Sequence, residues 1–299
     1  MKEDGLRRTL ALVALAAGLL TLGASPAGAI TGNYQQDFAH PYVGLVAFYG
    51  SAGNFTHRCS GSLIAPSVFL TAGHCTDATT GATQARIWFE QDAGVGFDAS
   101  SGTPAPSGYP VSGGVTSHAL YNYGFANFAG FPDTHDVGLV ILDQPIGQSK
   151  YASQFTSFPA LAVAGSLNSL AKKRGQQDVT FTVSGYGLSL VNPVKVLSFR
   201  ERLTATEKLN NLGSNLTDGF NVQTSASPGN GRGGTCSGDS GGPLLYSSTD
   251  TIVAVNSFGL NENCRGNDFM YRIDRQPVLD WILAHSPAGE RGLIRIVSL

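Results

Sequence analysis

The sequence is poor in charged residues. Only 13% of its 299 residues are Asp, Glu, Lys or Arg, whereas globular proteins usually contain about a quarter. The 19 basic residues nearly balance the 21 acidic ones, and the one basic run is Lys172-Lys173-Arg174. A nucleic-acid-binding surface needs a broad basic patch. We therefore expect no nucleic-acid partner and interpret the triplet as a solvated loop.

Apolar runs of membrane-spanning length are also missing. The longest, from Leu10 to Leu22, follows Lys2, Arg7 and Arg8 and is followed by the small residues 27–29. It is shorter than the roughly 20 residues that span a bilayer, and the pattern is that of a secretory signal peptide. We predict that residues 1–29 are removed during export, by the general secretory route or, from Arg7-Arg8, by twin-arginine export. The mature protein would be extracellular and not bound to a membrane.

Cysteine is scarce, and its spacing excludes the usual zinc sites. The chain lacks the Cys-x-x-Cys and His-x-x-x-His clusters that bind zinc. We therefore expect no metal and no cofactor. An even number of cysteines in an exported chain predicts two disulfides, with three pairings possible. The four cysteines are Cys59, Cys75, Cys236 and Cys264.

From Tyr42 onward, short apolar and β-branched runs alternate with Gly, Ser, Asn and Pro. This pattern predicts an all-β sandwich or barrel. A single C-terminal helix is expected where Val278, Leu279, Ile282 and Leu283 share one face. Residues 94–114 are predicted to form an exposed loop, and residues 286–299 a loosely attached tail. The predicted strands cover residues 43–49, 61–64, 68–71, 85–89, 137–142, 179–183 and 252–258.

The strongest motif lies around Ser240, where residues 233–243 are GGTCSGDSGGP. A serine hydroxyl is a poor nucleophile unless a base takes its proton and donors stabilise the resulting oxyanion. The glycines beside Ser240 let backbone N–H groups approach a reacting carbonyl. The alternative interpretation is an ordinary Gly-Ser turn.

Two further motifs supply a base and a carboxylate. His74 ends the segment LTAGH and directly precedes Cys75, and a histidine pKa near neutrality suits a general base. Asp136 opens the apolar run at residues 137–142, where a histidine N–H would compensate its buried charge. His57 lacks the Thr-Ala-Gly approach, and His135 would point away from Asp136 on a strand. We place both outside the site.

Together these segments resemble those of the trypsin and chymotrypsin family of serine peptidases, as a secreted, bacterial-type member. The resemblance covers residues 30–285. It also includes RCSGSLI at 58–64, SGYG at 184–187 and NSFG at 256–259, where Tyr186 and Phe258 stand in place of Trp. Trp281 in the C-terminal helix fits the same pattern.

The resemblance implies two six-stranded antiparallel β-barrels and a C-terminal α-helix. The active-site cleft would lie between the barrels, with His74 and Asp136 from the first and Ser240 from the second. It also implies Cys59–Cys75 and Cys236–Cys264 as the disulfide pairs.

The implied function is that of a secreted serine endopeptidase acting through an acyl-enzyme. The backbone N–H groups of Gly238 and Ser240 would form the oxyanion hole, and Ser257, Phe258 and Gly259 would pair with the substrate backbone. The implied partners are protein or peptide substrates and proteinaceous inhibitors of a monomeric enzyme. The alternative is a catalytically inactive homologue that acts as a binding protein.

Members of this family usually need a free N-terminal Ile or Val that pairs with the Asp before the nucleophile. Cleavage after Ala29 would expose Ile30, so we predict an activation pair of Ile30 and Asp239. A short propeptide ending nearby is the alternative.

For the primary specificity pocket, the resemblance places Gly234 where trypsin-like enzymes carry Asp. A preference for Lys or Arg is therefore not expected. Gly259 would leave the wall open and Phe269 would narrow the base. Asn256 replaces the histidine of glutamate-preferring relatives. These residues predict a small or medium apolar substrate side chain.

Overall fold

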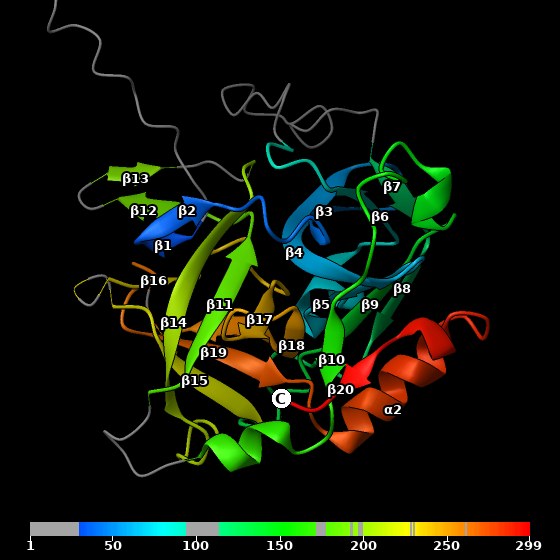
Figure 1. Cartoon of the computed structure of the whole chain (residues 1–299). Coiled ribbons are helices and arrows are strands. Elements are labelled where there is room, and N and C mark those ends of the chain that lie inside the picture. Colours follow the sequence, from blue (N-terminus) through cyan, green and yellow to red (C-terminus); the bar gives the residue numbers. More distant parts are fainter. Residues whose placement is uncertain are drawn as a thin grey trace, which may run out of the picture.

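A computed structural model shows two β-barrels side by side, with a helix packed against both (Figure 1). The structure describes residues 30–93, 114–171, 178–191, 194–196, 200–227, 229, 231–260 and 262–299. The predicted signal peptide, the basic triplet and all but the last residue of the predicted loop at 94–114 lie outside these residues.

The first barrel is built from seven strands in the order β7-β6-β3-β4-β5-β9-β8. Only His118 separates β7 from β8, and β7 pairs with β6 whereas β8 pairs with β9. The two short strands thus act as one bent strand that nearly closes the barrel. The strands are β3 (Val43–Tyr49), β4 (Phe55–Ala65), β5 (Val68–Thr71), β6 (Gln84–Trp88), β7 (Val115–Ser117), β8 (Ala119–Asn122) and β9 (Gly138–Ile141).

The second barrel is a closed ring of six antiparallel strands in the order β17-β11-β14-β15-β19-β18. It closes because β17 also pairs with β18. Both barrels agree with the predicted chymotrypsin-like fold. The strands of this ring are β11 (Thr180–Gly185), β14 (Leu203–Asn211), β15 (Asn221–Ser225), β17 (Pro243–Tyr246), β18 (Thr251–Gly259) and β19 (Asn267–Arg272).

Shorter elements extend this framework. Strand β2 (Tyr34–Gln36) pairs with β14, β1 (Thr31–Gly32) with β16 (Gly233–Gly234), and β12 (Ser189–Val191) with β13 (Val194–Val196). The 3-10 helices are η1 (Gly73–Cys75), η2 (Ala78–Thr80), η4 (Ile146–Gln148), η5 (Ser166–Leu170) and η7 (Arg291–Leu293).

Helix α2 (Gln276–His285) covers the junction of the barrels, and the predicted helix is confirmed. Pro277 suits the first turn, where no intrahelical N–H is needed. Val278, Leu279 and Ile282 are buried in one cluster with Leu70 of β5 and with side chains of the second barrel. Each such side chain contributes about 1.5–3 kcal/mol on burial. The helix therefore fixes the two barrels against each other.

The tail after this helix is not loosely attached, so that expectation was wrong. Strand β20 (Ile296–Val297) pairs in parallel with β10 (Ala160–Ala162), and Ile294 is buried in the shared core. The Glu290 carboxylate accepts hydrogen bonds from the backbone N–H and the hydroxyl of Ser67. The sequence pattern did not reveal that the tail is attached, because the residues that contact the tail are distant from it in the sequence.

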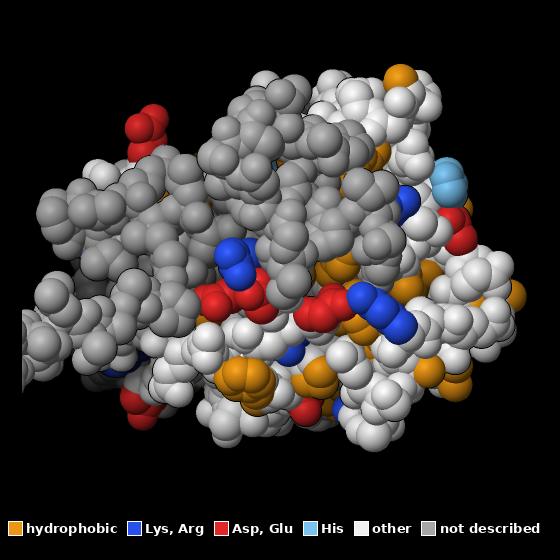
Figure 2. All heavy atoms as spheres, turned by 90° about the horizontal axis from the view of Figure 1, so that it is seen from above, with side chains coloured by type: hydrophobic (Ala, Val, Ile, Leu, Met, Phe, Trp, Pro, Cys, Tyr) orange, Lys and Arg blue, Asp and Glu red, His pale blue; other side chains and the backbone are white. Residues whose placement is uncertain are grey.

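The surface bears no large field of one charge sign on the face shown in Figure 2. Among the described residues visible there, basic side chains lie next to acidic ones. Among the described residues, Lys150 forms an ion pair with Glu90, and Arg200 forms one with Asp92. Within the described part of the chain, no helix is long and apolar enough to cross a membrane.

Candidate active site

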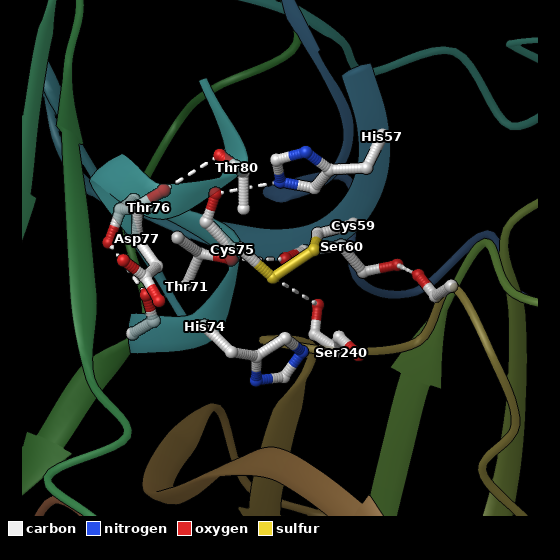
Figure 3. Close-up of a disulfide and its surroundings, with 12 residues drawn as sticks. His57, Cys59, Ser60, Thr71, His74, Cys75, Thr76, Asp77, Thr80 and Ser240 are labelled. Atoms are coloured by element: carbon white, nitrogen blue, oxygen red, sulfur yellow. Dashed lines mark hydrogen bonds between the residues drawn. A yellow bond between two sulfur atoms is a disulfide. The ribbon is translucent and has the colours of Figure 1, made fainter. Parts of the chain in front are cut away.

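His74 lies in the short turn η1, directly after β5. The neighbouring Cys75 is bonded to Cys59 of β4, which ties the turn to the barrel. Figure 3 shows His74 and Ser240 beneath this disulfide. A side chain at Gly73 would not fit, because its Cβ would lie 2.9 Å from Phe125 Cβ and 3.0 Å from the Val137 nitrogen. Glycine thus lets the turn pack closely against the segment that carries the carboxylate.

Asp136 is fully buried just before β9 and holds His74 at two points. Its Oδ1 accepts the backbone N–H of His74 at 2.7 Å, and its Oδ2 lies 2.9 Å from the ring Nδ1. The hydroxyl of Ser257 also donates to Oδ2. These bonds fix the imidazole orientation and favour the tautomer whose Nε2 is free to take a proton.

The pKa of His74 lies above its ordinary value. Burial lowers this pKa, but the negative charge of Asp136 and its hydrogen bond outweigh the burial. The imidazolium formed when His74 accepts a proton is therefore stabilised.

Ser240 is half-buried and lies on the turn before β17. Its carbonyl accepts the backbone N–H of Ser60 at 2.8 Å, which binds this turn to the first barrel. A Cβ at Gly241 would lie 2.1 Å from the Thr71 hydroxyl oxygen, so only glycine allows this approach. The hydrogen bonds among the described residues do not include one between the His74 ring and the Ser240 hydroxyl. Such contacts are often long in unliganded sites and tighten with substrate.

The turn also presents two backbone donors beside the hydroxyl. Gly238 has a φ of 100°, which suits glycine, and its carbonyl is held by the Ser60 hydroxyl at 2.9 Å. Within the described part of the chain, no acceptor binds the backbone N–H of Gly238 or Ser240. These are the donors predicted for the oxyanion hole, and that role stays a prediction.

Asp239 is completely enclosed and accepts the backbone N–H groups of Gly187 and Cys236, at 2.8 and 2.9 Å. Burial raises its pKa to about 7. Ile30 is buried in the core of the second barrel. No ion pair among the described residues joins Ile30 to Asp239. In the uncleaved chain the Ile30 nitrogen belongs to a peptide bond, so the predicted activation pair stays a prediction.

A cavity of about 380 Å³ opens beside Ser240. Ser257, Phe258 and Gly259 line it. Their predicted role in substrate binding stays a prediction. Phe269 does not line it, so the prediction that it narrows the base was wrong. It is buried and stacks on Phe258, with ring centroids 4.7 Å apart. Its neighbour Asp268 lines the cavity instead, because successive strand residues face opposite sides.

The other histidines near the motifs lie outside the site. His57 stacks on Phe48 and its Nε2 lies 2.8 Å from the Cys75 carbonyl, so it supports the histidine turn structurally. His135 has a φ of 52° and lies outside β9, with its ring beside Asp133. It faces away from the site because of this backbone turn and not because of strand alternation.

Both predicted disulfides are present, Cys59–Cys75 and Cys236–Cys264. Cys59, Cys75 and His74 place their potential ligand atoms within 4.8 Å of one another. The two sulfur atoms are bonded to each other and so offer no thiolate to a metal.

A family model described as Trypsin matches residues 29–282. The chain belongs to the trypsin family. Among its relatives, Serine protease 1 of Drosophila melanogaster is 25% identical over 259 residues, covering 85% of this chain and 84% of the relative. Trypsin zeta of Drosophila erecta is 27% identical over 259 residues, covering 84% and 85%.

Solved structures give the same fold. An HL collagenase has a TM-score of 0.57 at 20% identity, covering 85% of this chain and 96% of its own. The protease Anisep from Arthrobacter nicotinovorans has a TM-score of 0.52 at 19% identity, covering 80% and 93%. At these identities the likeness establishes the chymotrypsin-like fold of this trypsin-family chain.

Sequence reasoning missed three residues at this trypsin-family site. Ser60 bridges the barrels, because its hydroxyl accepts the Tyr186 N–H and donates to the Gly238 carbonyl. Glu207 and Asp268 form a buried carboxyl pair beside the cavity. Glu207 and Asp268 lie 61 positions apart on neighbouring parts of the barrel, so no local motif could reveal them.

Proposed function

We propose that this trypsin-family protein is a secreted serine endopeptidase of bacterial type, with His74, Asp136 and Ser240 as its catalytic triad. The observation that carries the proposal is the buried Asp136 carboxylate, which holds His74 beside the turn that presents Ser240 to the cavity. Family membership supports protein or peptide substrates. Secretion rests on the signal-peptide pattern in residues 1–29.

In the proposed mechanism, His74 takes the Ser240 proton as the hydroxyl oxygen attacks the peptide carbonyl. The backbone N–H groups of Gly238 and Ser240 stabilise the oxyanion of the tetrahedral intermediate. His74 then donates its proton to the leaving amine, and an acyl-enzyme forms on Ser240. Water activated by His74 releases the acyl group. Asp136 stays ionised and stabilises the imidazolium.

Activation is proposed to need a free terminus at Ile30. An ammonium group beside the Asp239 carboxylate would compensate a charge that is otherwise fully enclosed. Asp239 lies next to Ser240 and accepts the N–H groups of Cys236, from the same turn, and of Gly187, from a separate segment, so its charge state affects the oxyanion donors. Signal-peptide cleavage or removal of a short propeptide would supply this terminus.

The test is hydrolysis of a mixed peptide library by the secreted protein, with cleavage sites read by mass spectrometry. Ser240→Ala should abolish cleavage. Ser248→Ala, in an exposed turn after β17, is the matched control and should cleave like the parent. Sequencing the N-terminus of the same sample shows whether the chain begins at Ile30.

An inactive binding homologue would give no cleavage even with Ile30 as the verified N-terminus. It would also fail to react with a fluorophosphonate, which labels an activated serine in the absence of peptide. That pair of results would overturn the proposed function.

A further inference from the structure

A buried carboxylate lines the cavity beside Ser240. Asp268 is 2% exposed and lines the cavity from β19. Its Oδ2 accepts the backbone N–H of Thr235 at 2.6 Å, which fixes its direction. Across the strand pair, Asp268 lies in register with Gly259.

Two glycines make room for this carboxylate. A Cβ at Gly234 would lie 2.9 Å from Asp268 Oδ2 and 2.1 Å from Ala226 Cβ, so no larger residue fits there. A Cβ at Gly259 would be 3.9 Å from Oδ1. Gly234 stands where trypsin-like enzymes carry Asp. The carboxylate of Asp268, on another strand, lies next to this position. The cavity is not neutral, contrary to the expectation from Gly234 alone.

Glu207 interacts with Asp268 but is not among the residues that line the cavity. It is fully buried, its Oε2 accepts the Thr224 hydroxyl, and it shares a side-chain hydrogen bond with Asp268. No N–H or O–H of the described residues donates to Glu207 Oε1. Two carboxyl groups can share a hydrogen bond only when one of them holds a proton. We assign this proton to Glu207, because Asp268 already accepts a backbone N–H from Thr235, whereas Glu207 accepts only the Thr224 hydroxyl.

The directions of the two pKa shifts agree with this assignment. Burial, followed by the charge of Asp268, holds the pKa of Glu207 well above its usual range. Burial also raises the pKa of Asp268, against hydrogen bonds from Glu207 and Thr235 that lower it. The charge of the nearby Asp239 carboxyl also raises the pKa of Glu207. The pair therefore carries one negative charge, placed on the member that faces the cavity.

We infer that Asp268, backed by Glu207, determines the primary specificity of this site, and that the pocket takes a Lys or Arg side chain. This inference rests on the proposed peptidase function. An apolar substrate side chain would seal the negative charge of this carboxylate away from water without an opposite charge beside it, which is costly. An ammonium or guanidinium group supplies that opposite charge together with charge-assisted hydrogen-bond donors. Glu262 and Arg265 line the same cavity but are exposed, so water screens their charges.

The kinetic test uses peptide substrates that differ only in the residue before the scissile bond: Arg, Lys, citrulline and Leu. Citrulline matches arginine in shape but is uncharged. We expect kcat/KM to be about 10²-fold higher for Arg than for citrulline. Asp268→Asn should remove this difference, whereas Glu207→Gln, which keeps the donor to Asp268, should retain most of it. Asp143→Asn, at a half-exposed acid that binds His118, is the matched control and should change nothing.

A binding test separates this inference from the proposed function. Benzamidine carries a cationic group like that of arginine, and benzamide is a neutral analogue. Calorimetry with the Ser240→Ala variant, which performs no chemistry, should show benzamidine binding but no benzamide binding. Adding Asp268→Asn to the Ser240→Ala variant should abolish the binding of benzamidine. Each variant is first compared with the parent by circular dichroism.

The outcomes are distinct. Cleavage after Leu but not after Arg or Lys, with equal binding of benzamidine and benzamide, would overturn the inference and leave the peptidase intact. Benzamidine binding that depends on Asp268, without hydrolysis of any substrate, would overturn the proposed function and support the pocket assignment. If Asp268→Asn fails to fold, two measurements without this substitution still test the inference. They are the ratio of kcat/KM for the Arg and citrulline substrates and the ratio of the binding affinities for benzamidine and benzamide.

Discussion

Ser257 donates a hydrogen bond to the Asp136 carboxylate, so a residue of the second barrel stabilises an acid of the first. The same carboxylate orients His74. Ser257 therefore links the strand that is predicted to bind substrate to the proposed catalytic base across the barrel interface.

Removing this link should slow the reaction. Hydrogen bonds to charged groups contribute about 1.5–3 kcal/mol, so we expect Ser257→Ala to lower kcat by roughly 10- to 100-fold with a smaller effect on KM. Ser62 is a matched control because its buried hydroxyl has no partner among the described residues. Ser62→Ala should leave kcat unchanged. A rise in KM with kcat unchanged would show that Ser257 acts only in substrate binding.

Asp136→Asn should reduce kcat by about 10⁴-fold, because the amide does not hold the required imidazole tautomer. The charge of Asp136 also raises the pKa of His74, and only neutral His74 acts as a base. Activity of the parent should thus rise with pH through a pKa above the ordinary histidine value. In the variant, the residual activity should rise at lower pH. Profiles of kcat/KM against pH measure both effects, and an unshifted profile would contradict the assigned role.

Cleavage before Ile30 should change how stability depends on pH. In the uncleaved chain, burial raises the pKa of Asp239 to about 7 from an ordinary 3.8. The folded state then binds this proton more tightly than the unfolded state. The stability that this bound proton provides is complete below the pKa of Asp239 in the unfolded chain. It is lost as the pH rises to the folded-state pKa of about 7. The loss is roughly 4 kcal/mol at most.

A free Ile30 ammonium group would pair with the ionised Asp239 and remove this loss. Urea unfolding of both forms between acidic and neutral pH provides the measurement. Asp239→Asn in the uncleaved chain serves as the control and should also lack the loss. Equal pH dependence of the cleaved and uncleaved forms would argue against the activation pair.

Deleting residues 286–299 should destabilise the fold by at least about 2 kcal/mol. Ile294 would leave the shared core, and the Ser67 donors would lose the Glu290 carboxylate. Leu293→Ala is the control, because Leu293 is half-exposed and should have little effect. Thermal unfolding of the three proteins tests this, and an unchanged midpoint in the deletion would show that the tail carries no stability.

Much of the fold could be predicted locally. Strands β3 and β5 begin and end where the apolar runs do, and helix α2 falls where the 3.6-residue period predicted it. Because these elements bury one or both of their faces, their apolar residues recur in a pattern that predicts the type of secondary structure. The short strands β1, β10 and β20 were not predicted, because two or three residues give no periodicity and only their partners define them.

The sequence by itself determined the family resemblance and the triad candidates, because short motifs carry the local geometry that this chemistry needs. The resemblance in turn implied the disulfide partners. Only the tertiary structure showed the acid beside Gly234 and the attachment of the tail. Gly234 indicated an uncharged pocket, yet the Asp268 carboxylate of β19 lies next to it. Side chains distant in sequence meet there because strand register and barrel closure, which no local pattern encodes, set the direction of each side chain.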